Sequence, residues 1–333
     1  MRNGNKGNKR ETFNKYLGKG YLKVMIIRRY RDLNRHLRER FGCRVQRITL
    51  DAGLTCPNRD GTRGKGGCIY CNPRGSGTGL ANTMSITQQL QWGKERLARR
   101  YKAKKFIAYF QSFSNTYAPV DKLESLYREA MAMEDVVGLA IGTRPDCVPP
   151  EVLDLLEELN QETYLWVEYG LQSIHDATLK RINRGHTVEE FRRTVEETRR
   201  RDIEVVVHVI LGLPGEEKKE MLATAKALGE MDIQGVKLHL LYVIQGTPLA
   251  RLYQQGEYRC LTREEYVDVV CEFLALLPPH VVIHRLTGDP HPHELLAPTW
   301  AMEKQTNLQA IHRALEERDL WQGKWWKPSK KEL

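Results

Sequence analysis

A regular alternation of short apolar segments and longer amphipathic segments restricts the fold of this chain more than any other feature. The apolar segments predict strands at residues 47–51, 105–110, 137–141, 164–169, 204–211, 236–241 and 281–285. The amphipathic segments predict helices at residues 87–100, 120–133, 150–160, 188–200, 217–231, 263–277 and 300–318. Strands that alternate with helices form parallel sheets through right-handed crossovers. The chain is therefore predicted to be an α/β protein, with either a doubly wound sheet or a barrel.

Polar segments accompany the carboxyl ends of five of these predicted strands. They occupy residues 111–116, 142–146, 168–173, 208–215 and 239–247. In a barrel-type sheet, the carboxyl ends of the parallel strands gather the active site. Five such segments in register therefore favour a barrel over a doubly wound sheet, with one face that binds a ligand.

Three cysteines lie in a single glycine-rich loop after the first predicted strand. Cys56, Cys68 and Cys71 have a C-x11-C-x2-C spacing, and the gap contains Gly61, Gly64, Gly66 and Gly67. Thiolates are the ligands of iron–sulfur clusters, and glycines let a loop turn sharply around one. Three thiolates would leave the fourth iron of a four-iron cluster open to a small molecule. We therefore predict that Cys56, Cys68 and Cys71 are metal ligands.

The alternative for this loop is a structural zinc site. A C-x2-C pair is half of a common zinc motif, which normally needs a second pair. The other cysteines are Cys43, Cys147, Cys260 and Cys271, and none forms a second C-x2-C pair. Spacing alone leaves Cys43 open as a fourth ligand.

The charge of the chain indicates a polyanionic partner. The formal net charge is +10, basic residues crowd residues 6–40, and the end of the chain interleaves lysines with Trp321, Trp325 and Trp326. Basic and aromatic side chains together predict RNA contact. The alternative is that the charges are solvated and the tryptophans pack the last helix onto the body.

Composition also predicts the compartment and the organisation of the chain. No apolar run is long enough to span a membrane, and seven cysteines without a disulfide-like framework fit a reducing, cytoplasmic setting. We expect a basic, flexible segment at residues 1–25, a core at 26–290, and a C-terminal helix with a basic, tryptophan-rich tail at 291–333.

The cysteine loop and four further motifs resemble the radical SAM superfamily, and within it the YtqA/YhcC family, which is related to the elongator catalytic-subunit class. The further motifs are E-Y-G-L-Q-S at residues 168–173, R-I-N-R-G-H-T at 181–187, L-G-L-P-G-E at 211–216 and R-L-T-G-D at 285–289. The resemblance covers roughly residues 26–320. It implies a partial (β/α)6 TIM-type barrel with N- and C-terminal helical extensions, a [4Fe–4S] cluster on the three cysteines, and S-adenosylmethionine (SAM) bound at the open iron.

The resemblance also implies which strand-end residues contact SAM. These are Gln111, Ser112, Thr143, Arg144, Glu168, Gln172, Ile210, Gly212, Leu241 and Tyr242. Each has a structural alternative; for example, Glu168 could be a paired carboxylate inside the barrel.

Four histidines, His186, His208, His239 and His284, could act in acid–base chemistry or bind a metal, and core or hydrogen-bonded roles are equally open. The loop at residues 289–294 could bind a second metal, although its two prolines favour a stiff surface loop.

For the activity, the resemblance implies cleavage of SAM to a 5′-deoxyadenosyl radical, with an electron donor such as flavodoxin or ferredoxin. The implied substrate is the wobble uridine of tRNA, whose 5-carboxymethylaminomethyl group would become 5-aminomethyl, with or without a 2-thio group. A radical SAM enzyme acting on a peptide or small metabolite is one alternative. A non-catalytic RNA-binding protein with a structural zinc is another.

Overall fold

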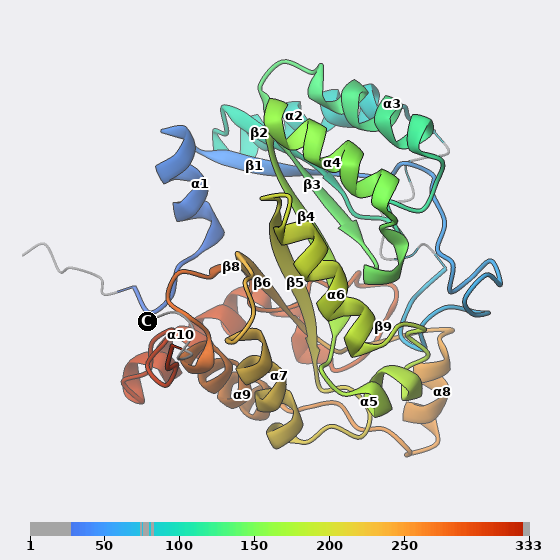
Figure 1. The fold of residues 1–333 in the computed structure, drawn as a ribbon. Coiled ribbons are helices and arrows are strands. Elements are labelled where there is room, and N and C mark those ends of the chain that lie inside the picture. The colour runs from blue at the N-terminus through green and yellow to red at the C-terminus, as the bar shows by residue number, and fades with distance from the viewer. Residues whose placement is uncertain (1–27, 74, 76–79, 81–82, 329–333) are drawn as a thin grey trace, which may run out of the picture.

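The computed structural model describes residues 28–73, 75, 80 and 83–328, and Figure 1 shows the fold. The segment at residues 1–25, expected to be basic and flexible, lies outside the described residues. Among the described residues, no helix combines the length and the apolar character needed to cross a membrane.

A curved sheet of seven parallel strands forms the centre of the protein. The strands run in the order β1 (Val45–Leu50), β2 (Lys105–Phe110), β3 (Val136–Thr143), β4 (Tyr164–Gln172), β5 (Glu204–Leu211), β6 (Gly235–Leu240) and β8 (Val282–Arg285). Each strand pairs in parallel with the next, and β1 and β8 form the two edges. The sheet is therefore a partial barrel, as the sequence predicts.

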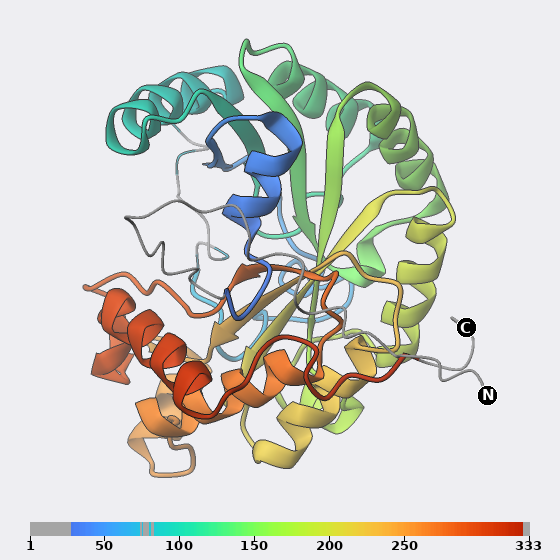
Figure 2. The ribbon, with the colours of Figure 1, turned by 90° about the vertical axis from the view of Figure 1, so that its left-hand side faces the viewer.

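Helices cover the outer, convex face of the sheet (Figures 1 and 2). They are α2 (Ile86–Tyr101), α3 (Val120–Met131), α4 (Pro150–Glu162), α6 (Val188–Arg199), α7 (Lys218–Leu228) and α9 (Arg263–Leu276). Sequence signals define several of their ends; for example, Thr262 and Glu265 form the reciprocal capping box that begins α9. The apolar faces of these helices and the outward side chains of the strands form the main hydrophobic core.

The remaining elements lie at the edges and around the carboxyl ends of the strands. They are α1 (Leu33–Phe41), α5 (Asp176–Arg181), α8 (Pro248–Gln254), α10 (Lys304–Glu317), two short 3-10 helices (Pro145–Cys147 and Thr299–Met302) and the antiparallel pair β7 (Val243–Ile244) and β9 (Leu295–Ala297). Helix α10 packs on α9. The domain boundary placed at residue 290 stays a prediction.

Helix α1 closes the side of the barrel that the sheet leaves open. It contacts both edge strands, β1 and β8, and Asp32, just before it, bridges to Ile283 of β8. Its buried residues Leu33 and Leu37 join an apolar cluster with Trp166 inside the barrel. The amino-terminal half of the barrel is thereby filled with side chains, and the space for a ligand lies toward the carboxyl ends.

Candidate active site

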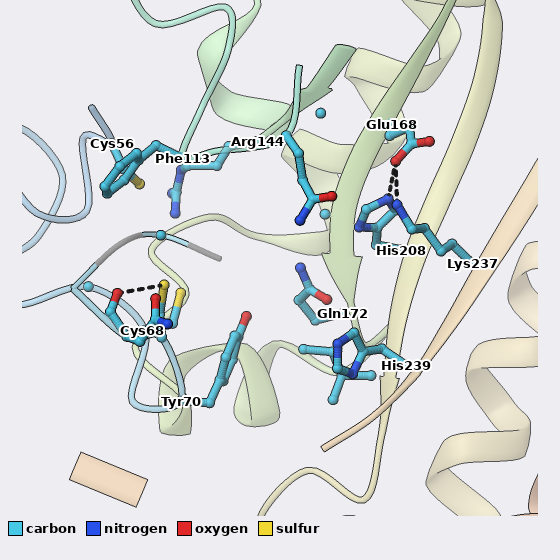
Figure 3. A pocket seen from close by; sticks show the side chains of 18 of the residues that line it. Cys56, Cys68, Tyr70, Phe113, Arg144, Glu168, Gln172, His208, Lys237 and His239 are labelled. Carbon is cyan, nitrogen blue, oxygen red and sulfur yellow. Dashed lines mark hydrogen bonds and ion pairs between the residues drawn. The ribbon is translucent and has the colours of Figure 1, made fainter. Parts of the chain in front are cut away.

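A cavity of about 480 Å³ opens at the carboxyl ends of the strands and runs into the barrel. Its volume lies within the range of about 300–1,000 Å³ that is usual for small-molecule sites. The cysteine loop, the strand ends and the loop after β8 all contribute to its lining. Figure 3 shows Cys56 and Cys68 on one side of the cavity, with Glu168, His208 and Lys237 on the other.

All three cysteines predicted as metal ligands line this cavity. Cys56, Cys68 and Cys71 carry free thiols, and Cys71 N–H donates to the Cys68 carbonyl at 3.0 Å, which closes a tight turn between the pair. Burial, with the nearby charges of Cys68 and Cys56, raises the pKa of the Cys71 thiol. The three sulfur atoms are thus close enough to influence one another.

Asn58 and Arg184 direct polar hydrogens at the Cys68 sulfur. Asn58 Nδ2 donates to Cys68 Sγ at 3.6 Å, and Arg184 Nη1 donates to the same sulfur at 3.7 Å. A Cβ on Gly64 would lie only 2.3 Å from Asn58 Oδ1, so this glycine leaves room for the amide. Hydrogen bonds to sulfur stabilise a thiolate and tune the potential of a cluster.

The donor set at this cavity fits a four-iron cluster. Cys56, Cys68 and Cys71 bring three thiols to one cavity. In a four-iron cluster each thiolate would bind a different iron, and the fourth iron would stay open. Cys43 precedes β1 whereas Cys56 follows it, so the six-residue strand separates them by about 20 Å. That separation removes Cys43 as a fourth ligand.

Eight of the ten residues predicted to contact SAM line the cavity. They are Gln111, Thr143, Arg144, Glu168, Gln172, Ile210, Leu241 and Tyr242. Ser112 and Gly212 are not part of the lining: Ser112 is fully buried, and Gly212 packs against Leu261 while its carbonyl accepts a hydrogen bond from Tyr258 at 2.9 Å. The specific contacts of all ten with SAM stay predictions.

Gln172 and Arg144 differ in how the surrounding structure holds their side chains. Gln172 has a positive φ of 76° at a register shift between β4 and β5, an uncommon conformation for a residue other than glycine. Figure 3 shows its amide inside the cavity, between the cysteine side and the Glu168 side. Arg144 instead pairs with Asp146, at 2.7 Å between Nη2 and Oδ2, and donates to the Arg184 carbonyl. Its guanidinium is therefore committed to holding the loop after β3.

Glu168 lies at the centre of a buried polar network inside the barrel. Its carboxylate accepts hydrogen bonds from Trp166 Nε1 at 3.0 Å, His208 Nε2 at 2.6 Å and Lys237 Nζ at 2.8 Å. Lys237 also donates to Tyr109 Oη at 2.6 Å. Glu168 is thus a paired carboxylate inside the barrel, which was the structural alternative for this residue. Glu168 and Lys237 also line the cavity.

This network shifts the pKa values of its members strongly. Although burial raises it, the Lys237 ammonium and the His208 hydrogen bond hold the pKa of Glu168 well below its usual range. Burial lowers the pKa of Lys237 to about 7, with Arg47 and Arg285 adding to the effect against the opposing Glu168. Burial and Lys237 lower the pKa of His208 to about 4. His208 is therefore neutral at physiological pH, and Glu168 is ionised.

The other histidines singled out in the sequence have different environments. His186 is buried away from the cavity, and neither ring nitrogen has a hydrogen-bond partner. His239 lines the cavity with its ring centroid 5.0 Å from that of Tyr242. His284 packs edge-on against Trp166, with Nδ1 3.8 Å from Glu168.

The loop at residues 289–294 lies against the cysteine loop. Glu294 accepts a hydrogen bond from Asn72 Nδ2 at 3.0 Å, next to Cys71, and Asp289 pairs with Lys304 at 2.7 Å. Asp289, His291 and Glu294 line the cavity. The loop therefore forms part of the wall around the thiols.

The described parts of the two basic segments, from residue 28 onward and up to residue 328, lie side by side near the amino ends of the strands. Gln322 N–H donates to the Arg29 carbonyl at 2.8 Å, and Trp326 Nε1 donates to the Gly229 carbonyl at 2.9 Å, just before β6. Trp326 is thus a packing residue, whereas Trp321 and Trp325 are 41% and 42% exposed. Trp321 borders a groove of about 540 Å³ with several arginines, Arg28, Arg29, Arg31 and Arg35.

Lys237, Tyr109 and Arg285 are cavity residues that sequence reasoning missed. Lys237 carried a detectable signal, because it interrupts the apolar strand G-V-K-L-H-L in phase with His239. With a period of two, both face the interior of the barrel. Arg285 belongs to the R-L-T-G-D motif at residues 285–289, but no role was assigned to it. Tyr109 carried no such signal, since an aromatic residue is ordinary in a strand.

Comparison with known proteins agrees with this site. The Radical SAM superfamily profile matches residues 58–228, and the Radical_SAM C-terminal domain matches residues 233–317. The chain is 44% identical to the uncharacterized protein YtqA of Bacillus subtilis (strain 168) over 299 residues, which cover 90% of this chain and 93% of YtqA. It is 40% identical to protein YhcC of Escherichia coli (strain K12) over 282 residues, which cover 84% and 90% of the two chains.

The fold is also similar to that of a solved archaeal protein, Elp3 of Methanocaldococcus infernus. The TM-score is 0.66 at 18% identity, and the match covers 84% of this chain and 64% of the Elp3 chain. At this identity the likeness shows the fold alone. The family profile and the two bacterial relatives place the chain in the radical SAM superfamily, within the YtqA/YhcC family, whose members use a [4Fe–4S] cluster and SAM.

Proposed function

We propose that this radical SAM enzyme acts on the wobble uridine of tRNA and converts its 5-carboxymethylaminomethyl group, with or without a 2-thio group, to 5-aminomethyl. SAM would act as the oxidant, and the two carboxymethyl carbons would leave as an oxidised two-carbon acid. The observation that carries the proposal is the single cavity that joins the cysteine thiols to the polar interior of the barrel. A flexible side chain on a uridine could enter this cavity from the carboxyl ends of the strands. The proposal includes an electron donor such as flavodoxin or ferredoxin, and a cytoplasmic setting.

When bound to Cys56, Cys68 and Cys71, the cluster would supply, together with SAM, radical chemistry able to act on an unactivated C–H bond. The residues of the chain position the reactants and exclude water. Asn58 and Arg184 support the Cys68 sulfur, and Gln172 projects its amide into the cavity. The buried Glu168–Lys237 pair keeps the far wall of the cavity rigid.

The groove between the two basic ends supports an RNA partner. It combines Arg28, Arg31 and Arg35 with the exposed ring of Trp321. Arginines neutralise phosphates, and an exposed indole can stack on an unpaired base. We expect Trp321→Ala to weaken tRNA binding, measured by filter binding, without changing SAM cleavage in the absence of tRNA. Unchanged affinity would remove this groove from the RNA interface.

Nucleoside mass spectrometry of tRNA tests the proposed reaction. A strain that lacks the gene should accumulate the 5-carboxymethylaminomethyl uridines and lose the 5-aminomethyl forms. Wild-type protein should restore the normal pattern, and Cys68→Ala, which removes one cluster ligand, should not. If both uridine forms stay at normal levels in the deletion strain, tRNA is not the substrate, and a peptide or small metabolite takes its place.

A further inference from the structure

The interior of the barrel holds more positive than negative charge. Glu168, which is fully buried, pairs with Lys237 at 2.8 Å and contacts Arg47 at 3.5 Å. Arg285, the last residue of β8, lines the same cavity. Burial lowers the pKa of His239 most, and the charge of Arg285 lowers it further. The same charge adds to the effect of burial in lowering the pKa of Lys237. Lys237 and Arg47 therefore contact this carboxylate, and Arg285 lies beside Lys237 in the pairing of β6 with β8.

Arg285 is the cation that this carboxylate does not neutralise. Within residues 28–73, 75, 80 and 83–328, no carboxylate forms an ion pair with Arg285, and its Nε is buried without a hydrogen-bond partner. The residue as a whole is only partly buried, and it lines the cavity. Its guanidinium is therefore accessible to a ligand in the cavity and has, in the described part of the chain, no protein carboxylate to compete with an anionic one.

The wall beside Arg285 is closely packed around the cavity. The rings of His239 and Tyr242 lie 5.0 Å apart and line the cavity. A Cβ on Gly288 would lie 2.7 Å from the Tyr242 ring and 2.9 Å from the His239 ring, so glycine allows the loop after β8 to pack on both. Lys237 donates to Glu168 and Tyr109, which leaves the third hydrogen of its ammonium group for a ligand.

We propose that Arg285 and Lys237 form an anion-binding subsite that holds a carboxylate of the substrate. The inference rests on the proposed function, because the carboxymethylaminomethyl arm ends in a carboxylate. A guanidinium binds a carboxylate through two parallel hydrogen bonds. Lys237 lies across the cavity from Cys56 and Cys68 (Figure 3), so the carbon atoms of the arm lie between the subsite and the cysteines.

The subsite gives the enzyme a preference for substrate over product. The 5-aminomethyl product has no carboxylate, and its amine carries positive charge at neutral pH. It therefore gains nothing from Arg285. The amine of the substrate arm is protonated as well, so the carboxylate alone makes the difference. SAM also has a carboxylate, and a variant of Arg285 must be tested against both molecules.

Binding of matched RNAs to the SAM-loaded holoenzyme tests the subsite. One anticodon stem-loop carries the 5-carboxymethylaminomethyl uridine, and the other carries the uncharged carboxamide of the same arm. Wild-type protein should bind the acid about tenfold or more tightly than the amide, which is the expected scale for a charge-assisted pair. Arg285→Gln should lower the affinity for the acid to that for the amide and leave the affinity for SAM unchanged.

Arg200→Gln is the matched control, because Arg200 is an exposed residue at the end of α6 that pairs only with Glu197 among the described residues. It should keep the wild-type preference. Arg285→Lys retains the positive charge but cannot form two parallel hydrogen bonds to a carboxylate, so it should keep part of the preference for the acid. This variant also tests the subsite if Arg285→Gln does not fold. Equal binding of acid and amide by wild-type protein overturns the subsite. So does a loss by Arg285→Gln of affinity for both RNAs alike or for SAM.

A small probe separates this inference from the tRNA proposal. If neither RNA binds, the tRNA proposal fails, and N-methylglycine is titrated into wild-type and Arg285→Gln holoenzyme by calorimetry. Binding of N-methylglycine by wild-type protein alone retains the carboxylate subsite for a different substrate. Equal binding by both proteins, or binding by neither, overturns it.

Discussion

Glu168→Gln should destabilise the barrel much more than Lys237→Met, because the interior carries surplus positive charge. Glu168 has no exposed side-chain surface and accepts hydrogen bonds from Trp166, His208 and Lys237. Glutamine keeps the shape but loses the charge, and its NH₂ group faces donors. Removing one partner of a buried pair costs about 3–5 kcal/mol, and here Lys237 stays buried without the carboxylate that raises its pKa.

Lys237→Met removes the cation of this pair instead. Glu168 then still contacts Arg47 and His208, and methionine fills similar volume without a charge. We expect a loss of only about 1–2 kcal/mol in the free energy of unfolding, within the usual range for single substitutions. The double variant Glu168→Gln, Lys237→Met should be more stable than Glu168→Gln alone, since it also removes the buried amine that has lost its carboxylate partner.

Urea unfolding of the cluster-free, reduced protein at neutral pH measures these differences. Intrinsic fluorescence follows the unfolding, and one of the six tryptophans, Trp166, donates to Glu168. The account requires the order wild type, Lys237→Met, double variant and Glu168→Gln from most to least stable. It would be refuted if Glu168→Gln lay within about 0.5 kcal/mol of wild type, the usual effect of a surface substitution, or if Lys237→Met were the more damaging change.

Two further predictions concern pH and the cysteine loop. Burial lowers the pKa of His208 and His284 to about 4 in the folded chain from the ordinary value of 6.5, so between these values the unfolded chain binds more protons. Stability should therefore fall as pH drops from 6.5 toward 4. His284→Phe removes one of the two groups, so the melting temperature should depend less steeply on pH in this variant. An unchanged slope would contradict the lowered pKa of His284. Gly64→Ala places a Cβ 2.3 Å from Asn58 Oδ1, so the Asn58 amide must move away from the Cys68 sulfur. The iron content after anoxic reconstitution should fall, while the far-ultraviolet circular dichroism spectrum stays unchanged. Full iron loading would show that Asn58 does not support the cluster site.

The sequence predicted the seven parallel strands well because each is a compact apolar run bounded by turn or capping residues. The predicted strands at residues 105–110 and 204–211 coincide with β2 and β5. The C-x11-C-x2-C spacing likewise predicted three thiols in one loop, and the structure brings them to one cavity. These features are local, and local patterns are what a single sequence records.

The sequence predicted the closure of the barrel and the charge inside it less well, because both depend on tertiary contacts. Nothing within residues 33–41 indicates that α1 fills the gap between β1 and β8. The same applies to the short pair β7 and β9, which joins residues 243 and 244 to residues 297 and 295. Glu168 could be assigned to the barrel interior, but its pairing with Lys237 requires strands β4 and β6, which are not neighbours in the sheet.

Electron paramagnetic resonance of the anoxically reconstituted, reduced protein tests most directly whether three cysteines hold a cluster that leaves one iron for SAM. Wild-type protein should contain one [4Fe–4S] cluster per chain, and its spectrum should change when SAM is added. Cys43→Ala should behave as wild type, because Cys43 lies at the far end of β1 from the cysteine loop. A protein that binds zinc in place of iron, or a cluster whose spectrum is indifferent to SAM, would contradict the account.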